Sequence, residues 1–293
     1  MTQPLKLAVF GNPIAHSISP LVHGIFAQQT GIAVDYGRIK VEGDFAAAAQ
    51  AFFNAGGVGC NVTVPCKPDA YDLVDCCTPS AQLARAVNTI KVKTDEQGKR
   101  TLLGDNTDGR GLLTDLQRLG APLAGASILI IGAGGATRGI VPPLLAPELG
   151  VTAITIVNRT VSKAQAIVQD MAELKAQLGA TTTLRACSFD ELKAHQPCPL
   201  FAVLLNATSL SLKGELPDLA DEIYRHAAFT YDLFYTPQGR TIFTEHCTAL
   251  GIPAVYDGLG MLVGQAALSF ALWTGVMPDV GAALTQVRAQ LGK

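Results

Sequence analysis

A chain of 293 residues is long enough for two domains of ordinary size. Its formal net charge of −2 excludes the strongly basic surface that draws proteins to nucleic acid or anionic membranes. Hydrophobic residues make up 48% of the chain and charged residues 16%, a balance that favours a well-packed soluble enzyme. We therefore expect a small-molecule substrate and neither a nucleic-acid nor a membrane partner.

The seven cysteines are odd in number and include no C-x-x-C pair. This pattern favours reduced thiols in the cytoplasm and predicts no metal site. The first 13 residues lack the long apolar region of a signal peptide. The uncharged segment 258–278 is long enough to cross a bilayer, but its glycines, Gln265 and Ser269 favour a buried helix of a soluble fold.

The N-terminal part predicts alternating strands and helices. A strand at 5–10 leads through a polar loop to a helix at 21–29, and a strand at 34–41 is followed by a helix at 44–54. Ser19, which precedes Pro20, is a good N-cap, so from this segment alone we interpret it as a cap. Ser17 and Ser19 together would also suit a polyhydroxylated ligand.

Two later segments carry candidate catalytic groups. A β-branched strand beginning at Val58 ends at Pro65 and is followed by Lys67, at the strand end where α/β sheets bind ligands. The alternative for Lys67 is a solvated lysine at a helix start. After a strand at 90–93 and a short apolar pair comes GDNTDG, residues 104–109. Asp108 fits a cap for a helix at 111–119, which leaves Asp105 for chemistry.

A dinucleotide-binding unit is predicted from residue 127 onward. The apolar run 127–131 predicts a buried strand. The turn that follows consists of Gly132, Ala133, Gly134, Gly135 and Ala136. Its glycines permit a tight turn and a close approach of backbone to an anion, and a helix opening there would aim free N–H groups at a phosphate. This arrangement is that of a Rossmann unit.

The end of the next predicted strand, 153–157, selects the cofactor. An NAD site usually has an acidic residue there, which binds the ribose 2′-hydroxyl. This chain instead has Asn158, Arg159, Thr160, Ser162 and Lys163. Arginine and lysine would bind a 2′-phosphate that a carboxylate would repel, so the predicted cofactor is NADP(H). The alternative is a basic loop that merely touches solvent.

The remaining elements continue the α/β pattern. We expect a helix at 163–178, strands at 181–186, 200–205 and 229–233, a helix at 238–250, a short strand and two final helices. Pro142-Pro143 must kink or end the helix after the glycine turn. Thr208 lies in a turn after one of these strands, at a place suited to flank a nicotinamide.

Nine ordered stretches resemble the shikimate dehydrogenase family, from Val9 to about Asp279. They are GNPIAHSISP, NVTVPCK, AVNT, GDNTDG, GAGGATRG, NRTVSK, NATS, YDLFY and DGLGMLVGQAA. The family reduces 3-dehydroshikimate to shikimate with NADPH. The resemblance implies two α/β domains with a cleft between them. Residues 1–104 plus 258–293 would form the substrate domain, to which the C-terminal helices return, and 105–257 the Rossmann-type NADP-binding domain.

The resemblance also implies roles for individual residues. The substrate would be bound by Ser17, Ser19, Thr63, Lys67, Asn88, Asp105, Tyr235 and Gln265. Lys67 and Asp105 would be the catalytic pair, with Asp105 holding the lysine that gives or takes the proton. Gly132, Ala133, Gly134, Gly135 and Ala136 would hold the pyrophosphate. Asn158, Arg159, Thr160, Ser162 and Lys163 would hold the 2′-phosphate, and Thr208, Leu233 and Gly258 would lie near the nicotinamide.

Three departures from the family pattern remain, of which the doubled proline Pro142-Pro143 affects only the helix behind the phosphate site, and two alternatives stay open. Lys163 stands where many relatives have a second arginine, which would weaken the preference for NADP. Leu210-Ser211 stand where the family usually has a glycine. One alternative is a quinate/shikimate dehydrogenase that also accepts NAD, and another is a non-catalytic NADP-binding sensor. Either a monomer or a homodimer is expected.

Overall fold

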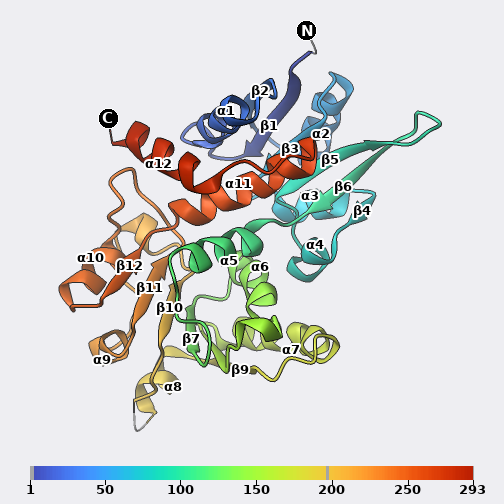
Figure 1. The fold of residues 1–293 in the computed structure, drawn as a ribbon. Helices are drawn as coiled ribbons and strands as arrows, with labels where there is room; N and C mark the ends of the chain where they lie inside the picture. The colour runs from blue at the N-terminus through green and yellow to red at the C-terminus, as the bar shows by residue number, and fades with distance from the viewer. Residues whose placement is uncertain (1–2, 196–197, 293) are drawn as a thin grey trace. The chain divides into compact units, whose positions relative to one another are not determined.

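The computed structural model describes residues 3–195 and 198–292. The chain divides into two units, each built on a six-stranded sheet (Figure 1). Unit 1 runs to Gly111 and resumes at Leu262, and unit 2 is Leu112–Met261. The sequence resemblance implies divisions at 104/105 and 257/258. Both observed divisions instead lie within helices, α5 (Asp108–Arg118) and α11 (Leu259–Thr274).

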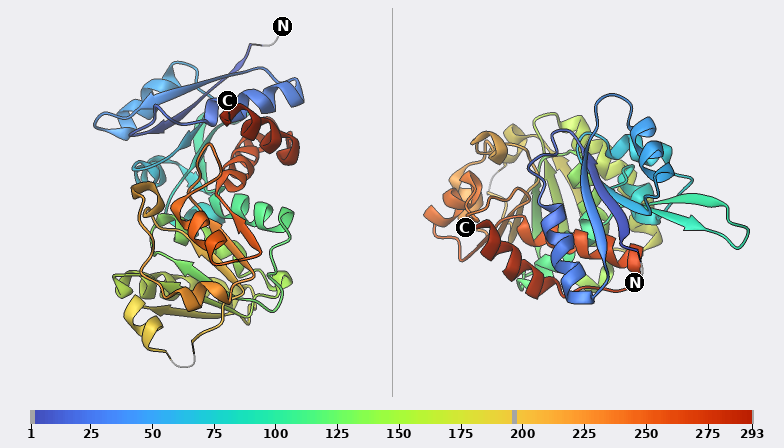
Figure 2. Two further views of the ribbon diagram at one scale, coloured as in Figure 1. Left: turned by 90° about the vertical axis from the view of Figure 1, so that its left-hand side faces the viewer. Right: turned by 90° about the horizontal axis from the view of Figure 1, so that it is seen from above.

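The sheet of unit 1 mixes parallel and antiparallel strands in the order β2-β1-β3-β5-β6-β4. Its strands are β1 (Leu5–Gly11), β2 (Val34–Lys40), β3 (Gly59–Val62), β4 (Cys76–Cys77), β5 (Thr89–Thr94) and β6 (Arg100–Asp105). β1 pairs in parallel with β2 and β3, and β5 is antiparallel to both β3 and β6. The β5–β6 hairpin extends beyond the rest of this sheet (Figures 1 and 2).

Helices cover both faces of this sheet. They are α1 (Ser19–Thr30), α2 (Phe45–Asn54), α3 (Lys67–Leu73), α4 (Pro79–Ala84), the greater part of α11, and α12 (Val280–Leu291). On one face, Phe45 of α2 and Ala70 of α3 pack with Phe10 and Cys60 of the sheet. α11 is tied to the sheet by Trp273, whose indole N–H donates to the Ile90 carbonyl at 2.9 Å. A buried, uncharged helix is therefore part of the unit 1 core.

The sheet of unit 2 is entirely parallel, in the order β12-β11-β10-β7-β8-β9. Its strands are β7 (Ser127–Ile131), β8 (Ala153–Val157), β9 (Thr183–Cys187), β10 (Val203–Asn206), β11 (Phe229–Asp232) and β12 (Ala254–Tyr256). Its α-helices, besides α5, are α6 (Gly135–Leu144), α7 (Val161–Gln177), α8 (Phe189–Ala194), α9 (Asp221–Arg225) and α10 (Ile242–Ala249). Strand order reverses between β7 and β10, which is where doubly wound sheets bind their ligands.

Alternate residues of each strand enter different cores of unit 2. Ile128 and Ile130 of β7 pack with α5, α6 and α7, whereas Leu129 and Ile131 pack with α8, α9 and α10. Side chains of adjacent strand residues point to opposite faces, so an uninterrupted apolar run is what a sheet covered on both faces requires. The predicted buried strand at 127–131 and the α/β fold class are confirmed.

Several predicted helix boundaries differ from the observed ones. The N-cap of α1 is Ile18, and Ser19 is instead the first helical residue, so the predicted Ser19 cap is wrong. α5 begins at Asp108, three positions before the predicted start. α10 begins only at Ile242, because Thr241 caps it through a hydrogen bond to the Thr244 N–H. Within the described part of the chain, none of the helices is long and apolar enough to cross a membrane.

Candidate active site

An ion pair in unit 1 joins Lys67 to Asp108. Lys67 is the first residue of α3, and Asp108 opens α5 directly after β6. The Lys67 ammonium donates to Asp108 Oδ2 at 2.6 Å. Both side chains retain some exposure, 26% for Lys67 and 13% for Asp108. The ammonium is therefore fixed in position while remaining accessible to a small molecule.

Asn88 links this ion pair to the α11 side of the unit. It lies just before β5 and is buried. Its Nδ2 group donates to Asp108 Oδ1 at 2.8 Å, Thr107 Oγ1 at 2.9 Å and Gln265 Oε1 at 3.2 Å. Its Oδ1 accepts the Thr107 N–H at 2.9 Å. Polar side chains from three separate parts of the sequence thus form one connected network around Lys67.

Asp105 does not hold Lys67, contrary to our prediction. Among the residues that the structure describes, no ion pair joins the two, and the lysine pairs with Asp108. Asp105 Oδ1 accepts the Thr78 hydroxyl at 2.6 Å and the Asn106 N–H at 2.8 Å, and Oδ2 is ion-paired with Arg110. Asp105 is the last residue of β6, and its side-chain partners Thr78 and Arg110 lie at the start of α4 and in the first turn of α5.

Ser17, in the loop before α1, is hydrogen-bonded to Ser19, the first residue of α1, and to β2. Ser17 Oγ donates to Ser19 Oγ at 3.1 Å, and the Arg38 guanidinium donates twice to the Ser17 carbonyl. The Ser19 side chain also lies beside the Tyr36 phenol. Burial raises the pKa of the Tyr36 phenol, which keeps it a proton donor at neutral pH. The backbone of Ser17 is thus held by the neighbouring strand β2, and its hydroxyl is held by Ser19.

Asn61, on β3, connects these serines to Asn88. Its Oδ1 accepts the Tyr36 hydroxyl at 2.7 Å. Its Nδ2 donates to the Asn88 carbonyl at 3.2 Å, to Thr89 Oγ1 at 3.1 Å and to Ser269 Oγ at 3.0 Å. Ser269 in turn donates to the Gln265 carbonyl. Our sequence interpretation gave Asn61 no role.

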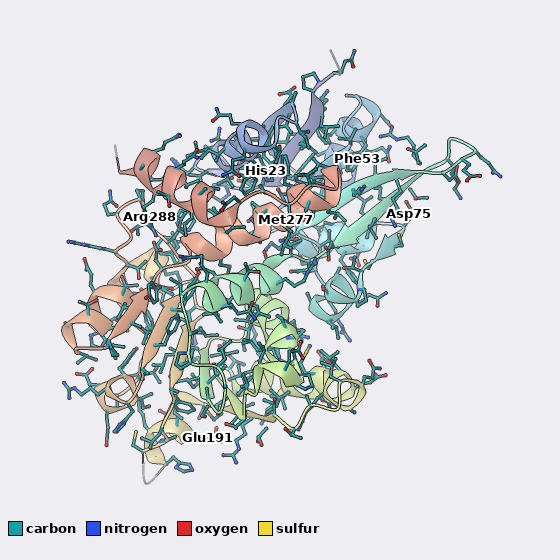
Figure 3. The ribbon with its side chains drawn as sticks, in the orientation of Figure 1. His23, Phe53, Asp75, Glu191, Met277 and Arg288 are labelled. Carbon is teal, nitrogen blue, oxygen red and sulfur yellow. The ribbon has the colours of Figure 1, made fainter. Side chains whose placement is uncertain are left out.

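His23 lies against this network from α1 (Figure 3). Its Nε2 is 3.2 Å from Asn61 Oδ1, and its ring stacks on Tyr36 with centroids 4.3 Å apart. Burial lowers the pKa of His23 to about 3, so the imidazole is neutral at physiological pH.

Thr63 is half-buried directly after β3, and its backbone N–H donates to the Phe10 carbonyl at 2.8 Å.

The glycine turn of unit 2 lies between β7 and α6. Gly132 has φ +105, and an added Cβ would lie 3.0 Å from Thr208 Cγ2 and 3.2 Å from the Ala207 carbonyl carbon. Gly134 is the N-cap of α6 without any side-chain cap, and an added Cβ at Gly134 or Gly135 would meet nothing within 4 Å. Free N–H groups therefore border open space at a helix N-terminus, as an anion site requires.

The basic residues after β8 are available for an anion. Arg159 and Lys163 are exposed, and within residues 3–195 and 198–292 neither forms an ion pair. Asn158 Nδ2 donates to the Thr160 carbonyl at 2.9 Å, which orders the turn before α7. Thr160 is the N-cap of α7 and Ser162 lies exposed in its first turn. Arg138, nearer the glycine turn, is instead paired with Asp170.

Three further predicted cofactor residues lie together in unit 2. Thr208 Oγ1 donates to Asn206 Oδ1 at 2.7 Å, and the Leu233 N–H donates to the Asn206 carbonyl at 2.9 Å. Gly258 packs so closely that an added Cβ would lie 2.1 Å from the Leu233 carbonyl oxygen. Tyr235 lies two residues after Leu233, in the segment that follows β11. Burial and, to a smaller extent, the nearby Asp257 raise the pKa of the Tyr235 phenol.

The structure brings most of the predicted site residues together within each unit. Lys67, Asn88 and Gln265 share one network. Ser17 is bonded to Ser19, which lies beside Tyr36, and Tyr36 donates to Asn61 of that network. Sequence reasoning missed Asp108, which it interprets as a helix cap, together with Thr107 and Ser269. The second acidic residue of GDNTDG, Asp108, was a sign in the sequence of a possible partner for Lys67, but an acidic residue there also fits the start of a helix.

Three family models match the chain. The shikimate dehydrogenase substrate binding domain matches residues 9–90, and the shikimate/quinate 5-dehydrogenase model matches residues 115–193. The shikimate 5′-dehydrogenase C-terminal domain matches residues 258–288. These segments contain the Lys67 strand end, the glycine turn and Gln265, respectively.

Solved structures resemble the whole chain. An Ael1 enzyme from Pseudomonas putida is 38% identical with a TM-score of 0.82, and the match covers 97% of this chain and 98% of that one. The 5-ketofructose reductase of a Gluconobacter species is 29% identical with a TM-score of 0.81, covering 99% and 100%. Shikimate 5-dehydrogenase from Thermus thermophilus, solved with NADP(H) and shikimate, is 30% identical with a TM-score of 0.79, covering 98% and 99%.

Proposed function

Since this chain belongs to the shikimate dehydrogenase family of oxidoreductases, we propose that it interconverts 3-dehydroshikimate and shikimate with NADP(H). The observation that carries the proposal is the Lys67–Asp108 ion pair, joined through Asn88 to Gln265. A fixed ammonium beside several uncharged hydrogen-bonding groups suits a ketone on a polyhydroxylated ring. A binding module would have no need of that ammonium.

The residues of unit 2 fit NADP(H). The open space beside Gly134 and Gly135 leaves room for a pyrophosphate at the N-terminus of α6. Arg159 and Lys163 would hold the 2′-phosphate with Asn158, Thr160 and Ser162, while Thr208, Leu233 and Gly258 would border the nicotinamide. When bound, NADPH supplies the hydride that reduces the ketone carbon. The Thermus relative was solved with this cofactor, which supports the assignment.

Lys67 would perform the proton transfer. Reduction of a ketone builds negative charge on its oxygen, which a nearby ammonium stabilises and then protonates. In the direction of oxidation, the neutral amine accepts the hydroxyl proton. Asp108 would keep the amine in position, in the role that the family resemblance implied for Asp105. The donors that already occupy both oxygens of Asp105 support this reassignment.

The hydroxyl and amide groups of unit 1 would orient the substrate. Ser17, Ser19, Thr63, Asn88 and Gln265 can each donate or accept a hydrogen bond, and Tyr235 of unit 2 offers one further hydroxyl. A polyol substrate needs many directed partners, and a site built this way rejects analogues that lack one hydroxyl. The ordered Ser17–Ser19 contact and the Asn61 network support pre-arranged partners for such a substrate.

A steady-state assay tests the proposal. Purified protein with shikimate and NADP⁺ is expected to produce the NADPH absorbance band. No increase with shikimate would contradict the proposed reaction. Quinate in place of shikimate, and NAD⁺ in place of NADP⁺, separate it from the dual-specificity alternative, and fructose-derived ketones test the activity of the Gluconobacter relative. Tight NADPH binding without turnover would favour the sensor alternative.

We also propose that the protein acts in the cytoplasm. All seven cysteines are free thiols, including the adjacent Cys76 and Cys77. Free thiols persist in a reducing compartment, which supports this location.

A further inference from the structure

A buried carboxylate in unit 2 gathers four hydrogen-bond donors. Asp232 is the last residue of β11 and is 0% exposed. Its Oδ2 accepts the hydroxyls of Ser211 and Thr241, each at 2.6 Å. Its Oδ1 accepts Asn206 Nδ2 at 3.1 Å and the Phe234 backbone N–H at 3.2 Å. Every donor is uncharged, and within the described residues Asp232 forms no ion pair.

These donors come from three separate segments. β10 and β11 lie side by side (Figure 1). Asn206 ends β10, and Ser211 lies in the segment that follows it. Phe234 belongs to the loop after β11, and Thr241 is the N-cap of α10. A carboxylate accepts several bonds at once, whereas an asparagine amide would present N–H groups to the donors on one side. Asp232 therefore fixes two strand-end loops relative to each other.

Both loops carry residues assigned above to the nicotinamide end of the cofactor. Asn206, held by Asp232, accepts the Thr208 hydroxyl and N–H at its Oδ1 and the Leu233 N–H at its carbonyl. Phe234, also held by Asp232, accepts the Gly258 N–H at 3.0 Å. Thr208 is thus connected to Asp232 through Asn206, and Gly258 is connected to it through Phe234. Leu233 directly follows Asp232 in the sequence.

The adenosine end is built differently. The glycine turn and the segment from Asn158 to Lys163 follow β7 and β8, and none of the four donors to Asp232 comes from them. We infer that Asp232 is a positioning residue that orders the nicotinamide end of the cofactor site but not its adenosine end. The inference rests on the proposed function, because it takes the cofactor to be NADP(H).

The test compares two ligands in matched variants. Asp232→Asn keeps the size of the side chain but removes its charge, and Ser211→Ala removes a single donor as a milder change. Asp115→Asn is the control, because Asp115 is also buried in unit 2 but accepts from Tyr231 and Arg118. Dissociation constants are measured for NADPH and for adenosine 2′,5′-bisphosphate, which contains only the adenosine half, and kcat is measured with NADPH.

We expect Asp232→Asn to weaken NADPH binding or lower kcat by about 10- to 100-fold, the range for a hydrogen bond to a charged group, and Ser211→Ala to do so by a smaller factor. The dissociation constant of the bisphosphate should change by less than about twofold in both Asp232→Asn and Ser211→Ala. Asp115→Asn should not weaken NADPH binding more than bisphosphate binding. Equal weakening of both ligands, or an unchanged NADPH dissociation constant together with an unchanged kcat, would overturn the inference. If Asp232→Asn does not fold, Ser211→Ala decides by the same criteria. Failure of the wild-type protein to bind either ligand would instead contradict the proposed function.

Discussion

Lys67 and Asp108, 41 residues apart in sequence, meet in a 2.6 Å ion pair at the starts of two helices. Asp105, only three residues before Asp108, is instead held by Thr78, Asn106 and Arg110. Two carboxylates of one short motif thus have different partners. Their different surroundings allow the role of each to be tested by the same substitution.

The first prediction compares these carboxylates. Asp108→Asn removes the charge that orients the Lys67 ammonium, so kcat should fall by about 10²-fold, within the range for disrupted acid–base catalysis. Asp105→Asn leaves the Lys67 contact intact, and its effect on kcat should be at least about tenfold smaller. Steady-state kinetics of both variants measure this. A larger loss in Asp105→Asn would show that the motif's first carboxylate is the one that supports the reaction.

The second prediction concerns the 2′-phosphate. Arg159→Gln should raise the KM for NADP⁺ by about 10- to 100-fold, because a charge-assisted hydrogen bond is lost, and should leave the KM for NAD⁺ nearly unchanged. Lys163→Gln should act in the same direction with a smaller factor, since lysine binds phosphate as a point charge. Lys175→Gln, in the last turn of α7, is the control. Equal effects on both cofactors would contradict a 2′-phosphate contact.

The third prediction separates two functions of glycine in the turn after β7. Gly134→Ala meets no atom of the protein and has φ −93, so the melting temperature should hold or rise slightly while NADPH affinity falls. Gly132→Ala, at φ +105 and close to Thr208 and Ala207, should lower the melting temperature. Thermal unfolding and cofactor titration give the two quantities. Undiminished NADPH affinity in Gly134→Ala would mean that the phosphate does not approach this backbone.

The fourth prediction is a pH dependence of stability due to His23. Its pKa is about 3 in the folded protein and near 6.5 when unfolded, so between these values only the unfolded state is protonated. Stability therefore decreases as pH falls below 6.5, by about 2 kcal/mol between pH 7 and pH 5. His23→Gln lacks this titration. Denaturant unfolding at pH 7 and pH 5 should show a larger loss of unfolding free energy in the wild-type protein than in His23→Gln. Equal losses in the two proteins would refute the burial of a neutral imidazole.

The dinucleotide unit could be predicted because its information is local. The bounds of β7 and β8 agree with the predicted strands, since both segments are mostly apolar and leave almost no polar face for solvent. The glycine turn directly follows β7. Arg159 could be proposed as a ligand of the 2′-phosphate from its place at a strand end, without knowledge of any long-range contact.

The carboxylate that pairs with Lys67 could not be chosen from the sequence alone. Asp105 and Asp108 both follow a short apolar strand, and an acid before a helix is a normal cap. Only the fold shows that Asp108 meets a lysine from α3 and an amide from the start of β5. Asp232 was missed for the same reason, because its four donors come from three segments and no spacing in the sequence indicates them.

The central claim is that the Lys67 amine transfers the proton that accompanies ketone reduction. The direct measurement is the rate at which 3-dehydroshikimate consumes NADPH in wild-type protein and in Lys67→Ala, with NADPH binding measured in both. We expect Lys67→Ala to lose about 10²- to 10⁴-fold in rate while its NADPH affinity is retained. A Lys67→Ala variant that reduces the ketone at the wild-type rate would contradict it.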